Sequence, residues 1–156
     1  MVADETILHR AAGITHVGCV RARNEDSFLL KQEIDKDCLL AVVADGMGGH
    51  LGGAIASSMA ISFFDAGWDL LCSGSKLASS LLDGAWLTRI AQLAQESIRL
   101  RAHQDPELNN MGTTLVAVAM CGLRASIAYI GDSRAYCFSD GVLKQVSRDH
   151  SLVQRM

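Results

Sequence analysis

The stretch Val43-Ala44-Asp45-Gly46-Met47-Gly48-Gly49-His50 joins the end of an apolar run to a glycine-rich turn. The run from Leu39 to Ala44 is continuous and apolar, which predicts a buried strand. Asp45 ends this strand, and the glycines after it let the backbone approach closely, so its carboxylate and an adjacent backbone carbonyl could both reach one hard cation. A solvated strand-to-helix turn is the simpler interpretation of an isolated Asp-Gly pair, so the choice depends on the rest of the chain.

The composition is typical of one soluble globular domain. The chain has 156 residues, of which 49% are hydrophobic and 20% charged, and a net charge of −3. Its charges are scattered, so neither a nucleic acid nor a membrane is expected as a partner. The apolar stretch 54–64 is shorter than the roughly 18 residues that span a bilayer. Residues 1–12 lack the apolar core of a secretory signal, so they are expected to be an N-terminal extension of a cytoplasmic protein, and residues 13–156 are expected to belong to a single domain.

The cysteines show no metal-binding pattern. Their number is odd and there is no CxxC pair, and four of them lie in or beside apolar runs, so they are predicted to be small buried hydrophobic residues. They are Cys19, Cys38, Cys72, Cys121 and Cys137. His16 and His50 could add ligands to a zinc site, but no ligand spacing supports one.

Strands are predicted in the first third of the chain and helices in the second. Residues 14–19, 27–31 and 39–44 read as strands, with a turn at 32–37. Residues 52–71 predict a buried helix and residues 77–102 a second helix. In the second helix the predicted core stripe is Trp86, Ile90, Leu93 and Leu100. Gly84 weakens the first turns, so the continuous helix is expected to start near Ala85.

Strands return in the last third of the chain. Residues 113–120, 124–130 and 134–138 are predicted strands, and Asp140-Gly141 predicts a tight hairpin before residues 142–143. These strands are expected to form a second antiparallel sheet. Strands, two long helices and then strands again indicate an α+β architecture.

Three further motifs accompany the Asp45 stretch. They are Arg21-Ala22-Arg23-Asn24-Glu25-Asp26-Ser27, Met111-Gly112-Thr113-Thr114 and Gly131-Asp132-Ser133-Arg134. In this order the motifs resemble the bacterial form of the metal-dependent type 2C (PPM) Ser/Thr protein phosphatases, and the resemblance runs from about Ile14 to the C-terminus, through Asp149-His150-Ser151. It implies a β-sandwich of two antiparallel sheets flanked by helices.

The resemblance also implies a site for two Mn²⁺ or Mg²⁺ ions, with a third and weaker one. Asp45 would bridge the two ions, the Gly46 carbonyl would bind one of them, and Glu25 and Asp26 would act mainly through coordinated waters. Asp132 matches the acid associated with the third ion, although a hairpin aspartate bonded to its own backbone is an equally good interpretation. Two such ions acidify a shared water and clamp the transferring phosphoryl group.

An arginine is expected to bind the phosphate. Arg21 lies four residues before Glu25, where the family has its phosphate-binding arginine, whose planar fork can grip two phosphoryl oxygens. Arg23 remains the competitor, because alternate residues of an extended segment point to the same face. His50 is expected to be structural, and the Met111–Thr114 motif to support the central strand.

The predicted function is metal-dependent hydrolysis of phosphoserine and phosphothreonine in proteins that a cognate kinase has phosphorylated. The family's later segments supply two further metal-binding aspartates, and this chain ends before either, so residues 13–156 are expected to be the N-terminal part of a phosphatase domain. The alternative is a catalytically inactive truncated phosphatase that acts as a phosphoprotein-binding or regulatory module. A nucleotide phosphate loop at residues 46–53 is disfavoured, because no Gly-Lys-Ser/Thr follows.

Overall fold

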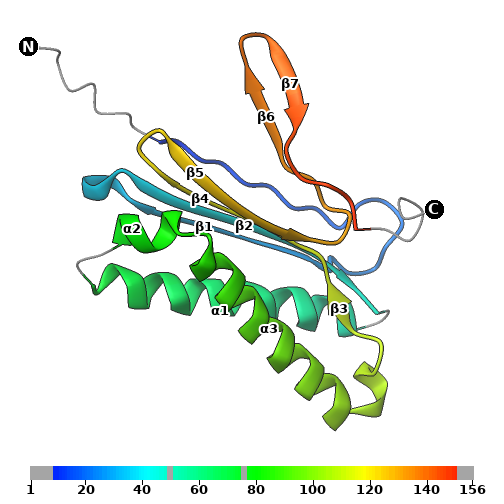
Figure 1. Ribbon diagram of the computed structural model, residues 1–156. Coiled ribbons are helices and arrows are strands. Elements are labelled where there is room, and N and C mark those ends of the chain that lie inside the picture. The colour runs from blue at the N-terminus through cyan, green and yellow to red at the C-terminus, as the bar shows by residue number, and fades with distance from the viewer. Residues whose placement is uncertain (1–8, 49–50, 75–76, 151–156) are drawn as a thin grey trace, which may run out of the picture.

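An antiparallel sheet with helices packed on one face forms the body of the chain in the computed structural model, which describes residues 9–48, 51–74 and 77–150 (Figure 1). Its strand order is β1-β2-β4-β5, and the short β3 pairs with the end of β2. The strands are β1 (Asp26–Glu33), β2 (Cys38–Met47), β3 (Gly112–Thr113), β4 (Leu115–Cys121) and β5 (Arg124–Ile130). The α+β class with antiparallel sheets flanked by helices is thereby confirmed.

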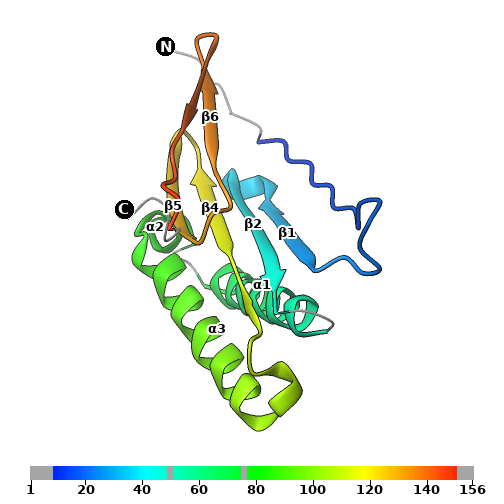
Figure 2. The ribbon, with the colours of Figure 1, turned by 90° about the vertical axis from the view of Figure 1, so that its right-hand side faces the viewer.

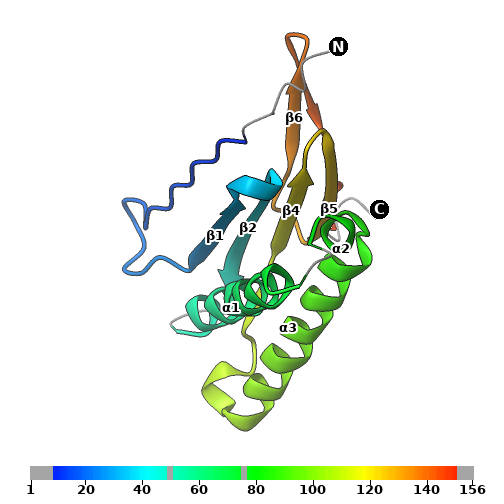
Figure 3. The ribbon, with the colours of Figure 1, turned by 90° about the vertical axis from the view of Figure 1, so that its left-hand side faces the viewer.

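Three helices cover one face of this sheet. They are α1 (Gly52–Cys72), α2 (Leu77–Leu82) and α3 (Ala85–Gln104), and two short 3₁₀ turns, Ile34–Lys36 and Pro106–Leu108, complete the helical elements of the described residues. In the two side views α1 and α3 lie next to each other below the sheet (Figures 2 and 3), and in Figure 1 α3 runs obliquely across α1. The other face of the sheet carries no helix from the described part of the chain.

The core lies between the helices and the sheet. Leu40 and Val42 of β2 and Ala117 of β4 are essentially inaccessible to solvent, as is Phe64 of α1. The ring of Phe64 meets Trp86 of α3 edge to face, with ring centroids 6.1 Å apart. Because side chains alternate along a strand, Val43 and Asp45 point to the face of the sheet without helices.

The predicted core stripe of α3 is displaced by about one residue. The buried residues of α3 are Leu87, Ala94, Ile98 and Ala102. Leu100 is 61% exposed, so its assignment to the core is wrong. The prediction assigned the largest apolar residues to the core. In the structure α3 buries the neighbouring stripe instead, whose alanines let the helix pack closely. Trp86 and Ile90 are half-buried instead against Gly67 of α1.

The second predicted helix is two helices. Gly84 adopts a positive φ of 36°, which favours glycine, and separates α2 from α3. The start of the continuous helix at Ala85 is confirmed. The first helix, predicted over residues 52–71, is confirmed to within one residue at its C-terminal end.

Two strand predictions are wrong. Residues 14–19 form no strand and make no ladder with the described residues; within them, the Thr15 hydroxyl accepts a hydrogen bond from the Asn24 amide at 2.6 Å. The strands after α3 do not form a separate sheet, because β4 pairs with β2 and β5 with β4. Among the residues that the structure describes, the second sheet consists of β6 (Tyr136–Ser139) and β7 (Val142–Gln145).

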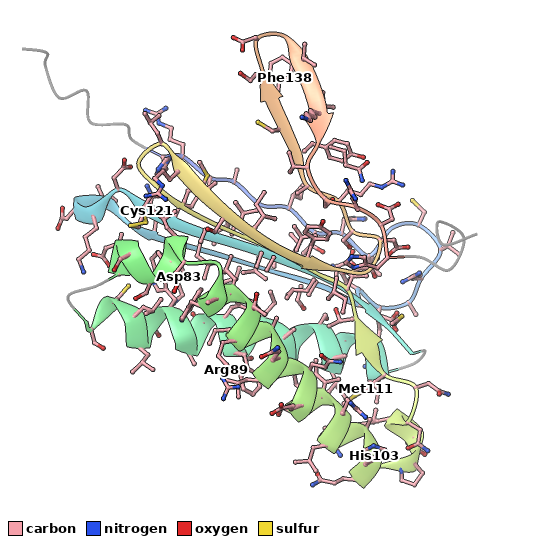
Figure 4. The ribbon with its side chains drawn as sticks, viewed as in Figure 1. Asp83, Arg89, His103, Met111, Cys121 and Phe138 are labelled. Carbon is pink, nitrogen blue, oxygen red and sulfur yellow. A yellow bond between two sulfur atoms is a disulfide. The ribbon has the colours of Figure 1, made fainter. Side chains whose placement is uncertain are left out.

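The β6–β7 hairpin rises on the side of the sheet away from the helices, with Phe138 near its tip (Figure 4). Asp140 and Gly141 both have positive φ, as a two-residue turn of this kind requires, so the hairpin predicted there is confirmed. At the base of the hairpin the guanidinium of Arg134 donates to both carboxylate oxygens of Asp149 at 2.5 to 3.1 Å.

Two of the five cysteines are exposed, contrary to the prediction. Cys19 and Cys137 are exposed and Cys72 is half-buried. Cys38 and Cys121 are buried, as predicted, but they also form a disulfide between directly opposed residues of β2 and β4. Within the described residues, no helix is long and apolar enough to cross a membrane.

The Arg134–Asp149 pair predicts an acid-sensitive base of the hairpin. Hydrogen bonds from Arg134 lower the pKa of Asp149 below its ordinary value of 3.8. A carboxyl with a lowered pKa in the folded state stabilises the fold above its unfolded pKa and loses that contribution as the pH falls through the folded pKa. We therefore expect Asp149→Asn to destabilise the chain at pH 7, and we expect its difference from the wild type to shrink as the pH falls below the ordinary carboxyl pKa of 3.8. Urea unfolding between pH 2.5 and 7 measures this; a difference independent of pH would contradict it.

Candidate active site

Two carboxylates face each other at one end of the sheet. The register of β1 with β2 places Asp26 directly opposite Asp45, on the face that carries no helix. Like charges directly opposite in an antiparallel pair are destabilising. Desolvation of the Asp45 carboxyl and the neighbouring Asp26 carboxylate raise the pKa of Asp45, Asp132 adds to this effect, and Arg21 opposes it. The sheet thus concentrates negative charge that its own residues do not neutralise.

The backbone after Asp45 is held tightly against the start of α1. The Gly46 amide donates to the Glu25 carbonyl at 3.1 Å, and the Ser57 hydroxyl of α1 donates to the same carbonyl at 2.6 Å. A Cβ atom on Gly46 would overlap the Gly53 carbonyl and lie 2.6 Å from the Glu25 carbonyl oxygen. Glycine is therefore required at position 46 for close packing of β2, α1 and the segment before β1.

These residues border an open cleft of about 850 Å³. Arg21, Arg23, Glu25, Asp45, Thr114 and Asp132 all line it, together with Gly46. Arg21 lies 3.4 Å from the Glu25 carboxylate, and its side chain is 66% exposed while that of Glu25 is 14% exposed. The structure brings both competing arginines to the cleft, so the choice between Arg21 and Arg23 remains open.

Asp132 reaches the cleft from the other end of the chain. It lies in the turn after β5, next to Gly131, whose φ of 97° favours glycine. Thr114 lies beneath this turn, and its hydroxyl is 2.6 Å from that of Ser133. The sequence motif around Thr114 indicated a supporting role only, and its hydrogen bond to Ser133 could not be anticipated because the two residues come from different motifs. His50 lies outside the described residues.

The donors at this end of the sheet suit a hard divalent cation. They are carboxylate and carbonyl oxygens, which Mg²⁺ and Mn²⁺ prefer, and the charge of the Asp26–Asp45 pair would be offset by a cation. Among residues 9–48, 51–74 and 77–150, no three His, Cys, Asp or Glu side chains are arranged as a ready cage for a metal ion. A divalent cation bound here would take carboxylate and carbonyl oxygens from the chain and complete its coordination with water.

Comparison with known proteins gives one consistent result. The family model of protein phosphatase 2C matches residues 19–152. The serine/threonine phosphatase stp of Listeria innocua is 38% identical over 146 residues, which cover 91% of this chain and 55% of that protein. The chain thus spans about half the length of the curated relatives it matches.

Solved structures agree with the sequence relatives. The catalytic domain of the serine/threonine protein phosphatase PstP, in complex with two manganese ions, is 35% identical with a TM-score of 0.73, and the match covers 88% of this chain and 54% of that one. The serine/threonine phosphatase Stp1 of Staphylococcus aureus is 28% identical with a TM-score of 0.79, and the match covers 91% of this chain and 54% of that one.

Proposed function

We propose that this chain, which belongs to the protein phosphatase 2C family, contributes to metal-dependent hydrolysis of phosphoserine and phosphothreonine in proteins. The observation that carries the proposal is the Asp26–Asp45 pair, two carboxylates at directly opposed positions of β1 and β2, of which Asp45 lines a cleft that also contains two arginines. Such a pair fits a dication, and the arginines fit a phosphate group.

We assign the metal-binding roles to the acidic end of the sheet. Asp45 and the Gly46 carbonyl would bind directly, Glu25 and Asp26 would hold coordinated waters, and Asp132 would serve a third, weaker ion. Either Mn²⁺ or Mg²⁺ suits these oxygen donors. When bound, two such ions generate a nucleophilic water at neutral pH and neutralise charge on the phosphoryl oxygens.

The residues of the chain contribute orientation and charge. Arg21 would donate to two phosphoryl oxygens and release Glu25 to orient water. The hydrogen bonds from Gly46 and Ser57 to the Glu25 carbonyl fix the backbone next to the Glu25 and Asp26 side chains. The backbone of the site is therefore arranged before any substrate arrives, which is a general requirement for catalysis.

The partners would be proteins phosphorylated by a Ser/Thr kinase. The cytoplasmic location predicted from the sequence is likewise a proposal. The Cys38–Cys121 disulfide offers a direct check of it, because cytosolic reductants keep most thiols reduced. Protein taken rapidly from cells and alkylated under denaturing conditions, which expose both buried sulfurs, should have both cysteines reduced; a disulfide that persists there would contradict a cytoplasmic location.

Hydrolysis of a phosphothreonine peptide by the purified 156-residue chain tests the function. We expect phosphate release with Mn²⁺, none after treatment with a chelator, and recovery when Mn²⁺ is added back. A folded chain that binds the phosphopeptide through Arg21 but never turns it over would instead support the alternative, a phosphoprotein-binding or regulatory module. Activity that persists in the chelator would contradict both.

The two arginines can be separated by parallel substitutions. Removing a bidentate contact to a phosphate leaves charge unpaired, so Arg21→Ala is expected to lower kcat/KM by roughly 100-fold, or about 3 kcal/mol. Arg23→Ala, the matched control at the same cleft, is expected to lower it less than about fivefold. A reversed order would assign the phosphate contact to Arg23 instead.

A further inference from the structure

Thr114 lies between β3 and β4 in the chain and is hydrogen-bonded to Asp45 near the end of β2. The Thr114 amide donates to the Asp45 carbonyl at 2.9 Å, and the Asp45 amide donates to the Thr114 hydroxyl at 3.1 Å. The register of β2 with β4 and β3, in which Val43 pairs with Val116 and Gly46 with Thr113, places Asp45 opposite Thr114. A regular ladder would use the Thr114 carbonyl at this point, whereas here the side-chain hydroxyl takes its place.

The same side chain contacts both neighbours of Asp132. The Thr114 hydroxyl is 2.6 Å from the Ser133 hydroxyl, and a Cβ atom on Gly131 would lie 2.7 Å from the Thr114 methyl carbon. Thr114 is only 8% exposed, so these contacts compete little with water. Thr114 therefore bonds both backbone groups of Asp45 and touches the residues on either side of Asp132.

We propose that Thr114 is a positioning residue, which acts with Ser133 to hold the Asp45 and Asp132 carboxylates at a fixed separation for metal binding. The proposal rests on the proposed metal-dependent function of the cleft. Threonine suits this role because its hydroxyl and methyl groups share one Cβ atom, whose rotamer is restricted, so one conformation sets both contacts. The hydroxyl can accept from the Asp45 amide and still share a hydrogen bond with Ser133.

Substitutions can separate the hydroxyl from the shape of the side chain. Thr114→Val keeps the branched shape against Gly131 and removes the hydroxyl, whereas Thr114→Ser keeps the hydroxyl. Ser126→Ala is the matched control. The Ser126 hydroxyl of β5 donates to the Leu82 carbonyl of α2 at 2.8 Å, and neither residue lines the cleft. All variants would first be compared with the wild type by circular dichroism and thermal unfolding.

Mn²⁺ affinity, measured by calorimetry without substrate, is the first readout. Groups that orient metal ligands typically contribute 10- to 100-fold in affinity, so we expect Thr114→Val to weaken Mn²⁺ binding by about that factor. Thr114→Ser should restore affinity to within about threefold, and Ser126→Ala should leave it unchanged. Ser133→Ala should weaken binding in the wild type but have little further effect in Thr114→Val, because the two hydroxyls act as a pair.

Hydrogen exchange at the Asp45 amide, followed by NMR without metal, is the second readout. Exchange should be faster in Thr114→Val than in the wild type and should return toward the wild-type rate in Thr114→Ser. A folded Thr114→Val variant with wild-type Mn²⁺ affinity would overturn the positioning role and leave the proposed function standing. A wild-type chain that binds no Mn²⁺ would overturn both.

Discussion

Asp45→Asn is expected to abolish Mn²⁺-dependent hydrolysis by this chain while leaving it folded. Asparagine has nearly the shape of aspartate but lacks the charge, so the proposed metal site would lose a charged oxygen ligand. Metal assistance contributes several kcal/mol to such reactions, which corresponds to a loss of roughly 10³-fold in kcat/KM. Phosphate release from a phosphothreonine peptide at saturating Mn²⁺ measures the loss, and calorimetry should show weaker Mn²⁺ binding.

The same substitution is expected to stabilise the metal-free chain. The pKa of Asp45 is raised above its ordinary value of 3.8, so the folded state binds a proton more tightly than the unfolded state does. The free energy of unfolding therefore decreases as the pH rises from the unfolded pKa of Asp45 through its higher folded pKa. At pH 7 the charged carboxylate opposes folding. Asparagine removes that charge from the position opposite Asp26, so the melting temperature without metal should rise at pH 7.

Asp140→Asn is the matched control for these measurements. Asp140 lies in the tight turn of the β6–β7 hairpin, in a positive-φ conformation that asparagine also tolerates, and it is not among the residues lining the cleft. It should change neither Mn²⁺ affinity nor hydrolysis. An Asp45→Asn variant that retains metal-dependent turnover would remove Asp45 from the mechanism, and a lower melting temperature without metal would contradict the electrostatic argument.

The sequence predicted the location of Asp45 well because the signals there are local. A continuous apolar run predicts β2, and the glycines after Asp45 predict that the backbone there packs closely against another segment. The packing of Gly46 against Gly53 confirms this. Local signals also gave β5 and the Asp140-Gly141 turn. The opposition of Asp26 and Asp45 was not foreseen, because it depends on the register of two strands, which no single segment determines.

The failures concern partners that are distant in sequence. Residues 14–19 have the apolar character of a strand, yet Ile14 is 93% exposed and the segment makes no ladder in the described part of the chain. The strand β4 was expected in a second sheet, but its small residues, including Ala117 and Ala119, suit the crowded space beside β2 and under the helices. Pattern alone predicts that a strand exists more readily than it predicts its neighbour.

Gly46→Ala is expected to damage both the fold and the metal site. The added methyl group would overlap the Gly53 carbonyl and approach the Glu25 carbonyl, and both contacts are with backbone, which cannot rotate away as a flexible side chain can. Overpacking of this kind costs about 3 kcal/mol at the upper end of its usual range, or roughly 10 °C in melting temperature for a chain of this size. Thermal unfolding followed by circular dichroism measures it.

The contact between Gly46 and Gly53 should also make metal affinity respond to this substitution. Pushing β2 away from α1 displaces the Gly46 carbonyl and strains the hydrogen bond from Gly46 to Glu25, so Mn²⁺ affinity should fall at least about tenfold in the fraction that remains folded. Gly74→Ala is the control, since a Cβ there meets only the Leu71 carbonyl at an ordinary 3.4 Å. It should leave affinity unchanged and alter the melting temperature by no more than about 2 °C. A Gly46→Ala variant as stable as Gly74→Ala would mean that β2 and α1 can separate freely, and the rigid backbone assigned to this end of the sheet would then be wrong.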